Sequence, residues 1–342
     1  MTYQIIWFVL WGVLWAVYFM LDGFDFGVGI LMNFFGKNDS EKRQIINTIG
    51  PVWDGNEVWL VTAGGATFAA FPTTYAYMFS FLYSALLIIL FALIFRGVAF
   101  EFRGKEENPT WKKFWDISIF FGSFIPALLF GVAFGNIFQG LKIDANGYHG
   151  TLFSLLNPYA LLTGLLFVAL FTLHGAIYLS LKTDKEIEER TKLFASKSFY
   201  FLLAVALLFL IYTPFATKLF DNFIANKSLF AVVALLVISL LAVKFFLIKK
   251  KEGLAFVFSS LTVLLTVATG IIGLYPNLIP SSIDPQYSLT IFNSSSSEYT
   301  LKIMTIVAFI FVPIVIAYQI WVYKVLKGKV TTEDVVNDPH SY

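Results

Sequence analysis

The chain has 342 residues, of which 58% are hydrophobic and only 13% are charged. Soluble domains carry about 25% charged residues, so this composition excludes a soluble enzyme, a disordered protein and a nucleic-acid-binding protein. The formal net charge of +2 gives no strong field for a polyanionic partner. Cysteine is absent, which excludes disulfides, cysteine-ligated metal centres and thiol nucleophiles. The composition therefore predicts an all-α polytopic membrane protein.

Nine windows are long and apolar enough to cross a bilayer, since a spanning helix needs roughly 20 mainly apolar residues. They lie near 4–32, 52–71, 75–98, 115–138, 158–181, 199–219, 228–248, 254–275 and 303–326. The first window could be a signal peptide, but it lacks a basic start and a small-residue cleavage site. We expect a single integral membrane domain over residues 1–342. A short internal echo, Leu21-Asp22-Gly23 and Leu173-His174-Gly175, fits two four-helix bundles plus one peripheral helix.

Lys and Arg are distributed unevenly between the two sides that nine spans would create. Alternate connections hold 20 of these 24 residues, and the N-terminus with the remaining connections holds 4. Positively charged loops favour the cytoplasmic side. The N-terminus is therefore predicted outside and the C-terminus in the cytoplasm.

The first predicted span contains two acids, Asp22 and Asp25. They are three residues apart and therefore share one face of a helix. The predicted orientation puts both in the cytoplasmic half of the membrane. Ionisable residues inside a span indicate a functional site, here a protonatable one. The alternative is that both are hydrated at the interface or hydrogen-bonded to a neighbouring helix.

The second predicted span starts with Asp54, Asn56 and Glu57. Asp54 followed three residues later by Glu57 matches a capping box. A helix starting after Asp54 would be only about 25 Å long, which is short for a bilayer of about 30 Å. We therefore expect these residues at or inside the cytoplasmic boundary.

Arg96, with Glu101 further along, ends the third predicted span on the same side. Isolated buried carboxylates become neutral, whereas a nearby arginine keeps one ionised. A mixed cluster of this kind suits proton entry from the cytoplasm. A structural ion-pair network is the alternative.

Small residues at a spacing of four let helices approach closely. This pattern predicts helix packing at Gly23, Gly27, Gly64, Gly65, Gly131 and Gly135.

The chain has three histidines, His149, His174 and His340, and only His174 lies within a span. A haem held in the membrane by two histidines is therefore excluded for this chain alone. A site formed by His174 and a methionine is conceivable, but such a histidine more often forms hydrogen bonds between helices. No metal-ligand cluster, phosphate loop or nucleophile–base pair is present, so we expect no metal, no catalytic residue and no cofactor site.

Several of these stretches resemble subunit II of the cytochrome bd quinol oxidases. The main ones are Asp22-Gly23-Phe24-Asp25-Phe26-Gly27-Val28-Gly29, Trp53-Asp54-Gly55-Asn56-Glu57-Val58-Trp59-Leu60 and Thr62-Ala63-Gly64-Gly65-Ala66. Shorter similar stretches lie at 122–126, 131–136, 255–262 and 280–282, so the resemblance covers nearly the whole chain.

The resemblance implies a subunit of a bacterial plasma-membrane complex that oxidises quinol, reduces oxygen to water and generates a proton-motive force. The b and d haems then belong to the partner, subunit I, and this chain binds none. By similarity, Asp54 and Asp25 match positions of a proton route and Trp59 matches an oxygen route, while Arg96 and Glu101 match a basic and an acidic position after the third span. The resemblance also implies contact with membrane lipid. It leaves open whether a small accessory subunit is a further partner.

Two other functions are compatible with the residues. Intramembrane carboxylates and glycine-rich helices also suit a proton-coupled secondary transporter, although no broken helices stand in matching halves. A purely structural assembly subunit is the third reading.

Overall fold

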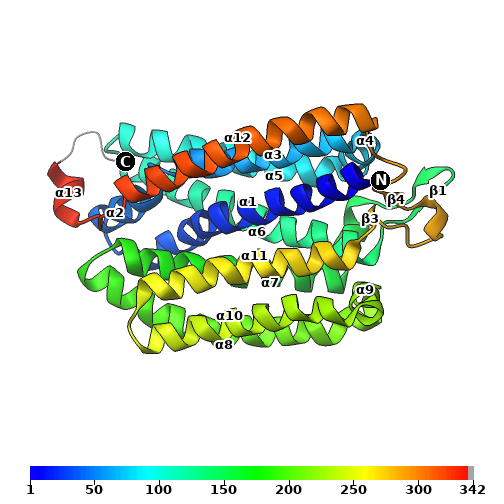
Figure 1. The fold of residues 1–342 in the computed structure, drawn as a ribbon. Helices are drawn as coiled ribbons and strands as arrows, with labels where there is room; N and C mark the ends of the chain where they lie inside the picture. The colour runs from blue at the N-terminus through cyan, green and yellow to red at the C-terminus, as the bar shows by residue number, and fades with distance from the viewer. Residues whose placement is uncertain (338–342) are drawn as a thin grey trace.

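The computed structural model describes residues 1–337 of the chain. Figure 1 shows long helices side by side along one axis, with two small β-hairpins at one end and α2 and α13 at the other. The long helices are α1 (Thr2–Phe35), α3 (Trp53–Ala70), α5 (Tyr83–Phe102), α6 (Pro109–Gln139), α7 (Pro158–Lys182), α8 (Lys185–Ala216), α10 (Phe230–Ile248), α11 (Glu252–Leu274) and α12 (Glu298–Val325). The shorter helices are α2 (Asp39–Ile49), α4 (Pro72–Phe81), α9 (Asp221–Ala225) and α13 (Thr332–Asn337).

The two hairpins lie in the connections after α6 and after α11. Strand β1 (Ile143–Asp144) pairs antiparallel with β2 (Gly147–Tyr148), and β3 (Asn277–Ile279) pairs antiparallel with β4 (Leu289–Thr290). Single 3₁₀ turns occupy Arg103–Lys105, Leu152–Leu155, Lys227–Leu229 and Pro285–Tyr287. Strand pairing in the hairpins supplies hydrogen-bond partners for backbone groups of these connections, which lie outside the helical bundle.

Eight helices of the described chain are long and apolar enough to cross a membrane, which confirms the predicted all-α membrane class. They are the long helices other than α3. Helix α3 is excluded because its first turns carry Asp54, Asn56 and Glu57. The ninth span and the membrane orientation stay predictions.

Some helix boundaries differ from the predicted windows. The window at 75–98 is two helices, α4 and α5, with an interruption at Leu82. Helix α8 begins at Lys185, well before the predicted start near 199. Its first turns are polar but stabilised by an i,i+4 ion pair between Glu188 and Lys192 at 2.6 Å. Hydropathy detects only the apolar part of such a helix.

The long helices pack as two groups of four with α12 outside them. In the first group, α1 contacts α3 and α6, and α5 contacts α6; in the second, α7 contacts α8 and α11, and α10 contacts α8 and α11. Helices α1 and α6 pack on α7 to join the groups. Helix α12 contacts α1 and α3, and only Leu301 and Thr305 of its residues are buried. This arrangement agrees with the predicted peripheral helix.

Glycines allow the closest contacts between helices. A Cβ added at Gly27 would lie 2.9 Å from the Cα of Gly175, where α1 crosses α7. A Cβ added at Gly131 would lie 2.6 Å from the Cα of Gly164, where α6 crosses α7. Both crossings therefore require glycine.

The other glycines of the predicted set behave differently from one another. A Cβ at Gly23 would lie 2.7 Å from the ring of Phe171, and one at Gly135 would lie 2.8 Å from the Cα of Ala160. At Gly64 and Gly65 an added Cβ meets no heavy atom of the described chain within 4 Å. These two glycines of α3 therefore form no close crossing among the described residues, and helix packing at them stays a prediction.

Candidate functional site

A buried ionic cluster joins α1, α3 and α5. Asp22 and Arg96 are fully buried, and Arg96 Nη2 donates a hydrogen bond to Asp22 Oδ1 at 2.5 Å. The same nitrogen lies 3.5 Å from Glu57 Oε1. The guanidinium carbon of Arg96 is 4.4 Å from the centre of the Phe26 ring, which adds a cation–π contact. The structure therefore brings together three of the predicted residues.

Asp25 is fully buried on the same face of α1 but has a different partner. Its Oδ2 accepts a hydrogen bond from Asn56 Nδ2 at 2.7 Å. Asn56 Oδ1 in turn accepts hydrogen bonds from Tyr323 at 2.8 Å and Gln319 at 3.2 Å, both in α12. Trp59 donates to Gln319 Oε1 at 2.8 Å. Peripheral α12 is thus bonded to the buried acids through α3.

The sequence analysis did not identify Gln319 and Tyr323 as part of this site. Both are uncharged, so a search for ionisable residues in spans passes over them. Their spacing of four, within an otherwise apolar helix, puts them on one face and is the signal that could have identified them.

Several buried polar atoms of the cluster have no protein partner among the described residues. They are the Tyr18 hydroxyl, Asp22 Oδ2, Asp25 Oδ1, and Arg96 Nε and Nη1. Buried polar groups usually have a hydrogen-bond partner, and bound water often supplies it. The cluster also contains three carboxyl groups but one guanidinium. The cluster therefore has more hydrogen-bonding atoms than its protein partners satisfy.

Asp54 and Glu57 lie at the exposed edge of the cluster. Helix α3 begins at Trp53 without a side-chain capping hydrogen bond, so the predicted capping box is not formed. Asp54 is exposed in the first turn, while the Glu57 side chain is 21% exposed. Glu101 is exposed and makes no hydrogen bond or ion pair within the described range. Burial of the acids therefore increases from exposed Asp54 through Glu57 to the fully buried groups. Glu101 is not part of the cluster.

His174 is buried between helices with both ring nitrogens in use. Nε2 lies 3.0 Å from the Met20 carbonyl oxygen, to which it must donate, and Nδ1 lies 2.7 Å from Ser259 Oγ. The ring stacks on Phe256 with centroids 4.9 Å apart. His174 therefore has no free nitrogen in this arrangement.

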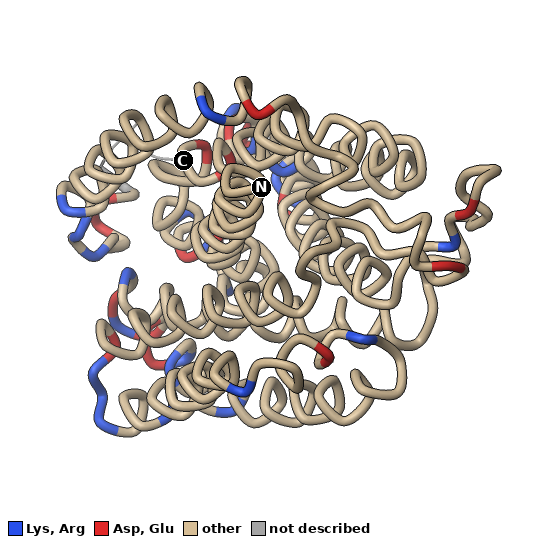
Figure 2. Tube along the Cα trace, turned by 45° about the vertical axis from the view of Figure 1, so that its right-hand side comes forward, with Lys and Arg blue, Asp and Glu red and all other residues tan. Residues whose placement is uncertain are grey.

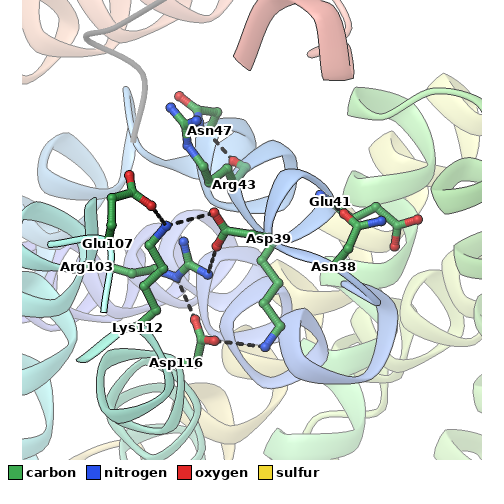
Figure 3. A network of polar contacts seen from close by, with 10 residues as sticks. Asn38, Asp39, Glu41, Arg43, Asn47, Arg103, Glu107, Lys112 and Asp116 are labelled. Carbon is green, nitrogen blue, oxygen red and sulfur yellow. Dashed lines mark hydrogen bonds and ion pairs between the residues drawn. The ribbon is translucent and has the colours of Figure 1, made fainter. Parts of the chain in front are cut away.

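A second charged network lies at the end of the bundle where α2 approaches the turn after α5 and the start of α6 (Figure 3). Asp116 accepts from Arg103 Nε at 2.6 Å and from Lys42 at 2.8 Å. Asp39 accepts from Arg103 Nη2 at 2.8 Å and from Lys112 at 3.1 Å. Lys112 also pairs with Glu107 at 2.7 Å. This outer network contains three cations and three carboxylates, and each ion has an opposite partner.

The helical bundle and its buried charges define a polytopic membrane protein that keeps ionisable groups in its interior. In the described residues no group of three or more His, Cys, Asp or Glu is arranged to hold a metal ion. Residues 3–326 match the family described as cytochrome bd terminal oxidase subunit II, and the chain belongs to this family. It is thus a subunit of an oxidoreductase complex of the bacterial respiratory chain, resides in the plasma membrane and has a partner subunit.

Named relatives match over nearly their whole length. Cytochrome bd ubiquinol oxidase subunit 2 of Bacillus subtilis is 40% identical over 330 residues, which cover 96% of this chain and 97% of that protein. Cytochrome bd-I ubiquinol oxidase subunit 2 of Escherichia coli K12 is 38% identical over 370 residues, covering 99% and 98%. The bd oxidase structure from Geobacillus thermodenitrificans matches with a TM-score of 0.78 at 19% identity, over 95% of this chain and 98% of that chain, and supports the fold.

Proposed function

We propose that this chain is the haem-free subunit II of a complex that couples quinol oxidation to the reduction of oxygen to water. It would support a haem-bearing subunit I and contribute to a proton-motive force by drawing protons from the cytoplasm. Family membership supports this assignment, as do the names of two relatives, which specify ubiquinol. The same membership favours an oxidase subunit over a secondary transporter.

The described histidines do not form a haem site inside the bundle. An axial ligand needs a free nitrogen or sulfur, and both nitrogens of His174 are hydrogen-bonded. His149 is exposed just after strand β2, where its Nε2 lies 2.7 Å from Asp144 Oδ1, and His340 lies outside the described residues. We therefore assign haem b and haem d to the partner. The complex purified through this chain should show haem absorption and a second large subunit, and the haem should remain with that subunit after dissociation.

The buried carboxyl of Asp25 is the observation that carries the proposed proton route. It has no cationic partner within 4.0 Å among residues 1–337, whereas Asp22 is paired with Arg96. A lone buried carboxylate is unfavourable, so such a group takes up a proton, and ionisable groups of this kind serve in proton relays inside membranes. In this route exposed Asp54 collects protons, Glu57 passes them inward near Arg96, and Asp25 delivers them toward subunit I.

We also propose that the open face of α3 contacts subunit I. At Gly64 and Gly65 an added Cβ would meet no described atom of this chain within 4 Å, and the adjacent Val61 and Phe68 side chains are exposed. Small residues of this kind allow close helix approach in membranes. Oxygen access near Trp59 is consistent with its position, because its indole lines an apolar groove open to the bilayer, where oxygen, a nonpolar gas, is more soluble than in water.

Asp54→Asn in the intact complex tests the route. We expect slower oxygen consumption with unchanged haem content and subunit ratio. Glu106→Gln is the matched control, because Glu106 is exposed and forms no ion pair among the described residues. Normal turnover of the Asp54→Asn complex would show that the route is wrong. Loss of assembly instead would support a purely structural role.

A further inference from the structure

A groove separates peripheral α12 from α1 and α11. Its volume is about 520 Å³ and it is open to the outside of the bundle. The walls are mostly apolar, with Val17 and Phe24 from α1, Phe256 from α11, and Ile316 and Ile320 from α12. This volume lies within the range of about 300–1,000 Å³ found for ligand sites.

One end of the groove carries two lysines, one in the last turn of α12 and one just after the helix. Lys324 and Lys327 both line it, and both side chains are exposed. Neither has a carboxylate within 4.0 Å in the part of the chain that is described. Both charges are therefore exposed at the groove without a carboxylate counter-ion among residues 1–337.

These lysines lie where the chain concentrates its positive charge. Figure 2 shows Lys and Arg gathered at the ends of the helices, most densely at the end that carries α2 and α13. The turn of residues 249–251 and the basic residues of α2 and α8 lie on this same side. In a membrane protein that end meets the lipid headgroups. The lysines are therefore at headgroup level, and the apolar groove runs from them toward the middle of the bilayer.

We propose that this groove binds an anionic phospholipid, with its phosphate group at Lys324 and Lys327 and an acyl chain along the walls. Basic pockets between helices on the cytoplasmic side suit anionic headgroups. Polar side chains deeper in the groove do not favour a polar ligand there: Tyr323 and Gln319 both donate inward to Asn56. Only the lysine end offers free charge, and the remaining length suits hydrocarbon.

The occupant also has a mechanical consequence. Helix α12 has few buried residues of its own, and an unfilled apolar gap beside it would lose dispersion contacts. Beyond the lysine end of the groove, two hydrogen bonds hold the chain to the end of α7. Val330 N donates to Lys182 O at 2.8 Å, and Lys182 Nζ donates to Gly328 O at 2.8 Å. A bound acyl chain would support the part between this anchor and the extracellular end.

The test uses the intact oxidase complex in nanodiscs of phosphatidylcholine with a minority of phosphatidylglycerol. Phosphatidylglycerol retained after transfer to detergent is counted by native mass spectrometry. The double variant Lys324→Gln/Lys327→Gln should bind it about 30-fold more weakly than the wild type, which corresponds to about 1 kcal/mol for each lysine. Lys250→Gln/Lys251→Gln is the matched control, because these exposed lysines lie on the same side but outside the groove.

A second variant tests the apolar half independently of the charges. Ser260→Phe adds a ring on the α11 wall and should reduce phosphatidylglycerol retention with both lysines intact. Haem content and subunit ratio verify that each complex is assembled. Equal retention by the Lys324→Gln/Lys327→Gln variant and the wild type would overturn the proposal. An equal loss in the control pair, or a quinone or phosphatidylcholine retained in place of phosphatidylglycerol, would also overturn it.

Discussion

The inner cluster around Arg96 and the outer network around Asp116 use the same residue types but differ in balance. In the outer network three cations meet three carboxylates. Asp116, for example, pairs with two cations, Lys42 and Arg103. In the inner cluster one arginine serves Asp22 and Glu57, and Asp25 has only an amide donor. The outer network is closed, whereas the inner cluster has unpartnered oxygen and nitrogen atoms.

This difference indicates what each network can do. A balanced network holds its members in place and has no reason to exchange protons, so it fixes α2 against α6 and the 3₁₀ turn that follows α5. An unbalanced, buried cluster has groups whose charge depends on proton uptake. We therefore expect changes in the outer network to affect stability and changes at Asp25 to affect turnover.

Replacing Arg96 should have the largest effect. Arg96→Gln leaves Asp22 buried without its cation, and breaking a buried ion pair in this way costs about 3–5 kcal/mol. Thermal unfolding of the complex, followed by haem release, should shift to lower temperature. The double variant Asp22→Asn/Arg96→Gln removes both charges and should recover part of the loss. A double variant as unstable as Arg96→Gln would contradict the pairing.

Asp25→Asn should come next, with an effect on turnover. Asparagine keeps the size of the side chain and an oxygen that can accept from Asn56, but it cannot take up a proton. Oxygen consumption should fall roughly 100-fold, the order that general acid–base groups contribute, while the unfolding temperature changes little. A loss of stability with normal turnover in the surviving complex would reverse the assignment.

Asp116→Asn should show the opposite behaviour. The change leaves Arg103 with Asp39 and leaves Lys42, whose side chain is 23% exposed, without a partner. We expect a loss of about 1–3 kcal/mol in stability, the order of a lost buried hydrogen-bonding partner. Turnover per assembled complex should equal the wild type. Slower turnover at full haem content would show that the outer network also takes part in proton transfer.

The sequence predicted the inner cluster because acids and arginine stand out in apolar windows. It identified Asp22, Asp25, Glu57 and Arg96, and it could not show that Asp25 and Asp22 have different partners. That difference depends on Asn56 facing α12, a contact between residues more than 260 positions apart.

Other features were beyond the sequence for physical reasons. Gly64 and Gly65 in α3 and Gly131 and Gly135 in α6 all lie in stretches of small residues, yet among the described residues only the second pair meets another helix. Spacing shows that a helix can be approached closely, and it does not tell which surface approaches it. Helix α2 is short and polar, so hydropathy gave no signal for the element that carries two of the six ions of the outer network, Asp39 and Lys42.

The smallest expected effect concerns the exposed edge of the outer network. Burial raises the pKa of Asp39, but hydrogen bonds from Arg103 and Lys112 outweigh burial and hold the pKa below its ordinary value. A lowered pKa stabilises the folded state above the ordinary value of about 3.9, and the contribution is lost as the pH falls through the lowered pKa. Because the Asp39 side chain is 45% exposed, we expect about 0.2–1 kcal/mol from it.

Asp39→Asn should therefore lower the unfolding temperature slightly at neutral pH, and the difference from the wild type should shrink as the pH falls below about 4. Added salt should shrink the difference as well, since exposed charges are screened. Glu106→Gln, at an exposed acid without an ion pair among the described residues, should show no such dependence. A difference that grows on acidification would mean that Asp39 is not held in its charged form by Arg103 and Lys112, and the outer network would then be as unbalanced as the inner one.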